Sequence, residues 1–208
     1  MNKNLMMALA LSLTCSSTAM AASGDRTDGA ATPQSRALVS PAPSAVSVSY
    51  TIDAATPVTE VGRMTRDGVP STCATPKAFP GVFNAPTLYR QVASVPLFNR
   101  NATATCATIV VTPDAACDIN VFSSAYLGSF DPANIATNYL ADSGSSFGIP
   151  ASAASFSFEV LVPASASIVV NLNDANPGTA TGVACTVQVS SNELFISLPV
   201  SLQKFSVD

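Results

Sequence analysis

The 208-residue sequence contains no histidine and no tryptophan. Without histidine it cannot supply a Ser-His-Asp triad, a Cys-His pair or a histidine-ligated metal, so most hydrolase chemistry is excluded. A Ser-Lys dyad would depend on Lys77 or Lys204, and neither lies in a suggestive serine motif. A carboxylate pair could use Asp131, Asp142 or Glu159, but the mechanism depends on a spacing that sequence does not fix. We therefore expect a protein that is not an enzyme.

Charged residues are also scarce. They make up 11% of the chain, against roughly 25% of an average soluble domain. The balance is weakly acidic, with 13 acidic and 9 basic residues and a formal net charge of −4. Because no basic cluster is present to neutralise a phosphate backbone, nucleic acid is excluded as a partner.

Long apolar segments are missing except near the N-terminus. Lys3 precedes an apolar run at 5–13, and Ala19-Met20-Ala21 supplies small residues where a signal peptidase reads. This run is too short for a spanning helix, which needs about 20 residues. We interpret residues 1–21 as a signal peptide and expect a secreted or periplasmic protein without a membrane span.

Short segments of alternating polarity dominate the rest of the chain. Residues 22–45 have no apolar period and are typical of a flexible linker, and residues 46–208 then form a single domain. The alternating segments are 46–52, 108–112, 119–126, 156–162, 168–173 and 185–191. With turn residues between them, they predict an all-β fold, an antiparallel β-sandwich of the jelly-roll kind.

The segment 156–162 illustrates the pattern. Ser157 and Glu159 point away from the face that carries Phe156, Phe158, Val160 and Val162. A strand with this alternation has one buried side and one side in water. We therefore expect a solvated side chain at Glu159.

The C-terminal segment 193–205 continues the alternation, with Leu194 and Ile196 on its apolar face. It predicts an added strand beside 185–191. Pro199 cannot donate to a strand ladder, so the strand belongs at an edge. The segment either completes the core or mediates strand-based self-association.

Four cysteines follow the signal peptide: Cys73, Cys106, Cys117 and Cys185. An even number in an exported chain favours disulfides, and three connectivities are open. The shortest closure joins Cys106 to Cys117, but a tight turn at 113–116 would hold these two apart, so this pair requires a bulged connection. Cys185 shares the apolar face of its strand, and we expect it to be buried.

The stretch 124–147 is rich in turn-forming and aromatic residues. Asp131, Asn134, Asn138 and Asp142 offer oxygen atoms that could bind Ca²⁺. Asx residues and Asp131-Pro132 are also good turn formers, and this second interpretation is favoured. Tyr139 and its aromatic neighbours suggest a platform for sugars, although packing explains such aromatics more often.

The segments "TCATIVVTPDAACDINVFSSAYLGSFDPANIATNYLADSGSS" (105–146) and "FSFEVLVPASASIVV" (156–170), with 62–81 and 185–191, resemble a bacterial secreted module. It is similar to the jelly-roll domains of the pre-peptidase C-terminal type, over roughly residues 46–191. The resemblance implies an accessory, non-catalytic domain.

The resemblance also bears on the cysteines. It supports a disulfide between Cys106 and Cys117. Similar sequences carry further cysteines near Phe79 and Ala136, which this chain lacks. Cys73 and Cys185 are therefore expected either to pair with each other or to remain thiols.

These observations predict a non-catalytic exported accessory or interaction module with no cofactor other than Ca²⁺ as an option. Its partner is an unidentified protein or a glycan. The alternative is a carbohydrate-binding or adhesive domain that acts through the 124–147 loop.

Overall fold

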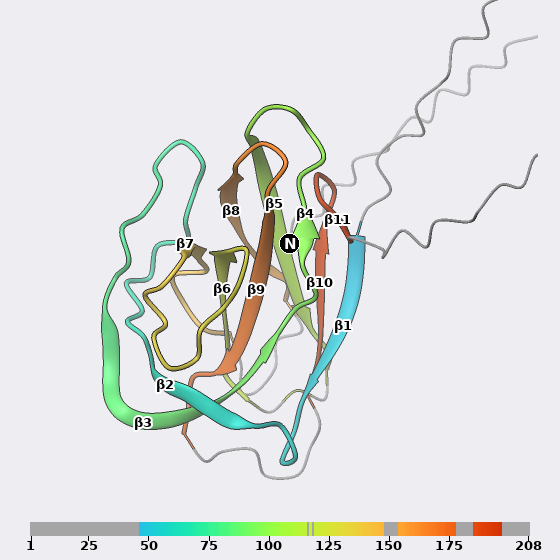
Figure 1. The fold of residues 1–208 in the computed structure, drawn as a ribbon. Coiled ribbons are helices and arrows are strands. Elements are labelled where there is room, and N and C mark those ends of the chain that lie inside the picture. The colour runs from blue at the N-terminus through green and yellow to red at the C-terminus, as the bar shows by residue number, and fades with distance from the viewer. Residues whose placement is uncertain (1–45, 116, 118, 148–153, 178–184, 197–208) are drawn as a thin grey trace, which may run out of the picture. The chain divides into compact units, whose positions relative to one another are not determined.

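The structure of the chain is a computed structural model that describes residues 46–115, 117, 119–147, 154–177 and 185–196. The expected signal peptide at 1–21 and the linker at 22–45 lie outside the described residues, as does 197–205. The described residues form strands and connecting loops, with no helix among them (Figure 1).

Eleven strands form in the described part of the chain. They are β1 (Val46–Ile52), β2 (Val58–Met64), β3 (Val82–Ala93), β4 (Leu97–Phe98), β5 (Thr105–Pro113), β6 (Val121–Leu127), β7 (Tyr139–Asp142), β8 (Phe156–Val162), β9 (Ser167–Asp174), β10 (Cys185–Ser191) and β11 (Phe195–Ile196). The six segments predicted from alternation correspond to β1, β5, β6, β8, β9 and β10.

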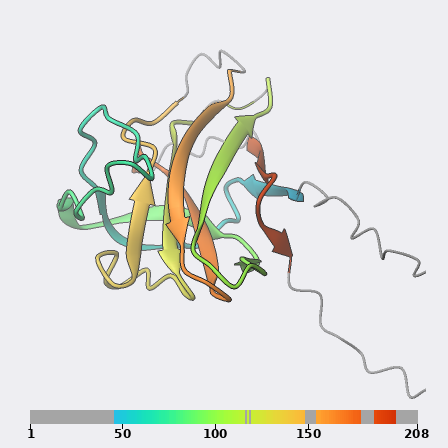
Figure 2. The same cartoon turned by 90° about the horizontal axis from the view of Figure 1, so that it is seen from above.

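The strands build two antiparallel sheets. One has the order β1-β10-β5-β8. The other runs β11-β4-β9-β3-β2, with β6 on the opposite edge of β9 and β7 beyond β6. The edge strands β1 and β11 lie on the same side of the sandwich in both views (Figure 1, Figure 2). This arrangement confirms the predicted class, an all-β antiparallel sandwich.

The main core lies between the two sheets. Alternate side chains of each central strand enter it, as the burial of β8 and β10 shows. From β9, it receives Ile168, Val170 and Leu172, all fully buried. Burying each such aliphatic side chain contributes on the order of 1.5–3 kcal/mol, so the alternation seen in the sequence supplies the main stabilisation of the fold.

Two of the strands that alternation does not predict, β2 and β3, pair with each other to form a ribbon. Register shifts interrupt their pairing just before Glu60 and just after Val61. Gly62 and Asn84 have positive φ angles of 68° and 58°. Bulges disturb the inside-outside alternation on which strand prediction depends. The C-terminal residues 91–93 of β3 join the ribbon to β9.

A second, smaller core covers the outer face of β6. Phe122 and Tyr126 point away from the main core and pack with Met64 and Ala175. The connection 65–81 between β2 and β3 contributes Phe79 to this second core. The outer face of this sheet is therefore covered, and the connection 65–81 is one of its covers.

The C-terminal strand does not lie where the sequence predicts. β11 pairs with β4, through Phe195 with Phe98 and Ile196 with Leu97. Both edges of β10 are already occupied, by β1 and β5, so no position beside 185–191 is open. Leu194 is fully buried in the main core, which agrees with the expectation that this segment completes the core.

Candidate functional site

The cysteines form two disulfides, Cys73–Cys106 and Cys117–Cys185, with sulfur atoms 2.04 Å apart in each. The predicted bridge between Cys106 and Cys117 is therefore wrong, as are both alternatives for Cys73 and Cys185. Two disulfides are typical of proteins that reside in an oxidising compartment. Cys185 is fully buried, as expected.

The observed pairing follows from the length of β5. Cys106 lies at the start of this strand and Cys117 follows its end. At roughly 3.3 Å per residue, Cys106 and Pro113 are separated by about 23 Å of extended chain. Each cysteine therefore pairs with a neighbour from elsewhere in the sequence: Cys73 in the connection 65–81, and Cys185 at the start of β10.

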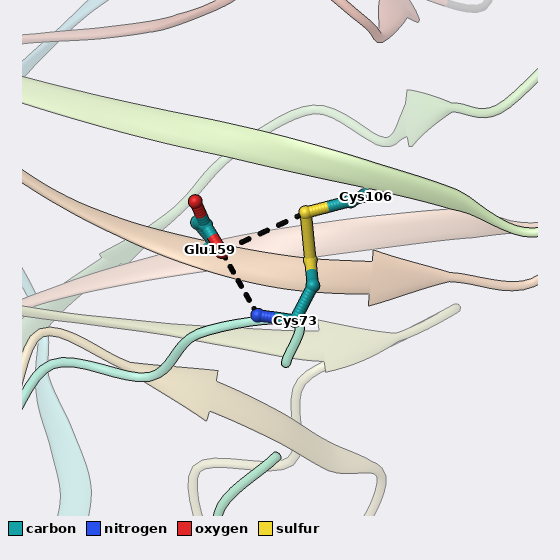
Figure 3. A group of neighbouring side chains, drawn as sticks. All are labelled: Cys73, Cys106 and Glu159. Carbon is teal, nitrogen blue, oxygen red and sulfur yellow. Dashed lines mark hydrogen bonds between the residues drawn. A yellow bond between two sulfur atoms is a disulfide. The ribbon is translucent and has the colours of Figure 1, made fainter. Parts of the chain in front are cut away.

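Glu159 lies beside the first of these disulfides (Figure 3). Its Oε2 accepts a hydrogen bond of 2.9 Å from the Cys73 backbone N–H and lies 3.7 Å from Cys106 Sγ. An oxidised sulfur carries no proton, so the second approach is a contact only. The Glu159 N–H also donates to the Ser71 carbonyl at 2.9 Å. Glu159 is half-buried rather than fully solvated as expected, because the connection 65–81 crosses the edge of β8 and contacts it.

This grouping of Cys73, Cys106 and Glu159 brings three atoms of the kind that bind metals within 4.8 Å of one another. In the oxidised protein neither sulfur is a thiolate, which is the form that binds metal. The group therefore acts as a clip that fastens the connection 65–81 to β5 and β8.

A second polar group, which we call the Asp142 cluster, consists of Asp67, Ser71, Lys77, Tyr139 and Asp142. It joins the connection 65–81 to β7. Asp142 is fully buried, a position that a carboxylate occupies only with charged or hydrogen-bonding partners. Its main chain pairs with Ser71, whose N–H donates to the Asp142 carbonyl at 2.9 Å while the Asp142 N–H donates to Ser71 Oγ at 2.9 Å.

Both carboxylate oxygens of Asp142 have partners. Oδ1 accepts from Lys77 Nζ at 2.9 Å and from the Gly144 N–H at 2.6 Å, and Oδ2 accepts from the Tyr139 hydroxyl in a very short hydrogen bond. Lys77 also donates to Asp67 Oδ1 at 2.9 Å and to the Val69 carbonyl at 2.7 Å. The three protons of the ammonium group thus have three acceptors, two of them charged.

Tyr139 remains protonated in this environment. Its burial raises the pKa of the Tyr139 hydroxyl, and the hydrogen bond to Asp142 and the charge of that carboxylate raise the pKa further. Burial likewise raises the pKa of Tyr126, with smaller contributions from the carboxyl groups of Glu60 and Asp142. The Tyr139 hydroxyl therefore donates to Asp142, whereas the Tyr126 hydroxyl accepts from Ser124 Oγ at 3.3 Å.

Glu60 is a buried carboxyl group outside the Asp142 cluster. It projects from β2 and is only 2% exposed. Asn171 Nδ2 donates to its Oε2 at 2.8 Å, and no ion pair to Glu60 is found among the described residues. Burial raises the pKa of Glu60 to about 8, an effect that the Asn171 hydrogen bond reduces. At neutral pH this side chain is largely a neutral acid.

The predicted loop residues separate into two groups. The structure brings Tyr139 and Asp142 together, whereas Asp131, Asn134 and Asn138 are exposed and make turn contacts. Asp131 Oδ1 accepts from the Ala133 N–H at 2.9 Å, the pattern of an Asx turn. Asn138 has a φ of 62° and donates to the Ser129 carbonyl. These contacts fit the turn interpretation that the sequence favoured.

The aromatic residues of the same stretch pack on one another. Tyr126 lies 4.7 Å from Phe130 and 6.3 Å from Tyr139 between ring centroids, and Tyr139 meets Phe79 edge to face at 5.4 Å. Tyr126 is 1% exposed. These rings belong to the second, smaller core. Packed at steep angles to one another, they do not present a flat platform to a sugar.

Sequence reasoning did not identify Glu60, Asp67 or Ser71. Glu60 lies on β2, where the bulges break the alternation that would mark it as buried. Asp67 and Ser71 lie in the connection 65–81, which has no hydrophobic periodicity. Lys77 was noted only as a lysine without a serine motif. No pattern within the sequence indicates that these residues meet β7 or β9.

Comparison of the chain with protein-family models, with curated proteins and with solved structures finds no match. Among the described residues, no helix is long and apolar enough to cross a membrane.

Proposed function

We propose that the protein is a non-catalytic exported module that binds another protein through the β2–β3 ribbon. The observation that carries this proposal is the exposure of apolar side chains there. On β3, Phe83 and Leu88 are 48% and 47% exposed and Val82 is also exposed; on β2, Val58 is exposed. Exposed apolar groups gathered on one element are typical of interaction surfaces.

The backbone of the ribbon supports the same proposal. β3 pairs with β2 along 82–90 but reaches β9 only at 91–93. None of the described strands pairs with the second edge of 82–88. An unpaired edge with apolar side chains favours binding of an extended segment by strand addition.

The polar groups support a role without catalysis. Lys77 donates a hydrogen bond to Asp142, and Glu159 accepts one from the Cys73 backbone N–H. A catalytic acid or base must reach a substrate atom, and these contacts turn the groups inward. Export is part of the proposal, which the two disulfides support.

The test is a pull-down from the medium or periplasm of the native host, with a variant that carries Phe83→Ser and Leu88→Ser. The matched control is Leu161→Ser, because Leu161 is 47% exposed on β8. We expect a partner that the control retains and the ribbon variant loses. Equal capture by both variants would contradict the ribbon as the binding surface.

The alternative, a carbohydrate-binding or adhesive domain using the 124–147 loop, is tested on a glycan array. Specific binding that is lost in Asp131→Ala or Asn134→Ala, both exposed in this loop, would replace the proposal above. The absence of binding across the array would favour the protein partner.

A further inference from the structure

We propose that Lys77 and Asp142 condense to form an intramolecular amide bond that crosslinks the connection 65–81 to β7. The two groups are in direct contact, with Lys77 Nζ 2.9 Å from Asp142 Oδ1. They are 65 positions apart in the sequence. Such a bond would attach the connection 65–81 to β7 covalently, at a point where the two already interact.

The carboxylate that would react is shielded from water, and the amine is mostly covered. The side chain of Asp142 is 0% exposed and that of Lys77 is 14% exposed. In water an amine and a carboxylate stay charged and do not condense. The fold holds the two groups in contact in a fixed orientation, which replaces a slow bimolecular reaction with an intramolecular one.

The neighbouring groups are placed to move the protons. Asp67 Oδ1 accepts from the same Nζ at 2.9 Å, which places this carboxylate to take a proton from the amine. On the other partner, the Gly144 N–H donates to Oδ1 and the Tyr139 hydroxyl donates to Oδ2. These donors polarise the carboxyl group from both oxygens, as an oxyanion site does.

The reaction balances without an oxidant or a co-reactant. Nζ gives a proton to Asp67 and then attacks Asp142 Cγ, which forms the C–N bond and places negative charge on Oδ1 beside the Gly144 N–H. The C–Oδ2 bond then breaks. Oδ2 leaves as water after receiving two protons, one through Tyr139 and one returned from Asp67, and Tyr139 recovers its proton from the attacking nitrogen. Ammonium and carboxylate become one amide and one water.

The decisive measurement is the mass of the protein purified from its native host, after reduction and alkylation of both disulfides. We expect the chain to be lighter by one water than its sequence requires. Trypsin should fail to cut after Lys77, and the peptide that contains Lys77 should be joined to the peptide that contains Asp142. A mass that equals that of the processed chain without loss of water, together with cleavage after Lys77, would overturn the proposal.

Two variants assign the roles. Lys77→Arg keeps a cation beside Asp142 but has no primary amine, so its mass should match its sequence. Loss of water that persists in this variant would overturn the assignment to Lys77. Asp67→Asn should raise the fraction of chains that lack the crosslink at a given time after synthesis, and an unchanged fraction would remove Asp67 from the mechanism. Because the wild-type mass is read from denatured protein, poor folding of a variant does not prevent a decision.

Discussion

Gly144 and Val69 meet backbone to backbone, where the connection 65–81 crosses the end of β7. A Cβ atom on Gly144 would lie 2.3 Å from both the carbonyl carbon and the carbonyl oxygen of Val69. Gly68 also donates its N–H to the Gly144 carbonyl at 3.0 Å. Only a residue without a side chain permits this approach. The N–H of the same glycine donates to Asp142 Oδ1.

Gly144→Ala is therefore expected to lower the free energy of unfolding by about 3 kcal/mol or more, because backbone atoms of Val69 must move. The control is Gly128→Ala. Gly128 has the same φ of +69°, but a Cβ there would meet nothing within 4 Å, so only the conformational cost of about 1–2 kcal/mol applies. Urea unfolding measures both. Equal losses in the two variants would contradict the close approach.

Glu60 predicts a dependence of stability on pH. The unfolded carboxyl group has its ordinary pKa of 4.5, and the folded one has a pKa of about 8. Between these values the folded state holds a proton that the unfolded state has lost. The free energy of unfolding should thus fall by about 1.4 kcal/mol per pH unit from about pH 5 to about pH 8, and the Glu60 contribution should level off above that range.

Glu60→Gln tests this dependence, since glutamine can still accept from Asn171. Relative to wild type, the variant should gain about 4 kcal/mol of stability between pH 5 and pH 8. Denaturant titrations at unit steps of pH give the comparison. Parallel pH profiles for the two proteins would show that Glu60 ionises normally in the folded state.

The two disulfides should differ in their access to reductant. Cys106 is exposed, whereas Cys117 and Cys185 are buried. Because exchange requires a thiolate to reach a sulfur atom, mild reductant should open Cys73–Cys106 first under native conditions. Alkylation followed by peptide mapping identifies the opened pair. A peptide that links Cys106 to Cys117 would contradict the structure itself.

Leu194→Ala should cost about 2–5 kcal/mol, since Leu194 is fully buried in the main core. Leu161→Ala is the control, and its exposed side chain should change stability by less than about 0.5 kcal/mol. Thermal or denaturant unfolding measures both variants. A negligible effect of Leu194→Ala would mean that the C-terminal segment does not complete the core and would favour its role in self-association.

The fold class was predictable because the central strands alternate regularly. In β8 and β10 every second side chain is buried, so the period of two in the sequence reports directly on the core. The ribbon was not predictable in the same way. Gly62 and Asn84 take positive φ angles and the pairing of β2 with β3 shifts twice, so neighbouring residues do not keep to alternate faces.

The site was predictable only in part. Tyr139 and Asp142 could be named because they lie in a stretch rich in turn residues and aromatics. Lys77 is 65 positions from Asp142, and no local pattern reports a contact at that separation. The predicted cysteine pairing was wrong for a related reason. Cys106 and Cys117 are close in sequence, but the extended strand β5 between them holds them apart in space.

The connection 65–81 carries a mechanical consequence. It is fastened to β5 through Cys73, to β8 through Ser71 and Glu159, and to β7 through Lys77 and Ser71. A pull on the ribbon at Phe83 would reach these three strands within a few residues, because Thr65 and Gly81 close the base of the connection. The load would then be shared by both sheets, and β2 could not be peeled away as a free edge.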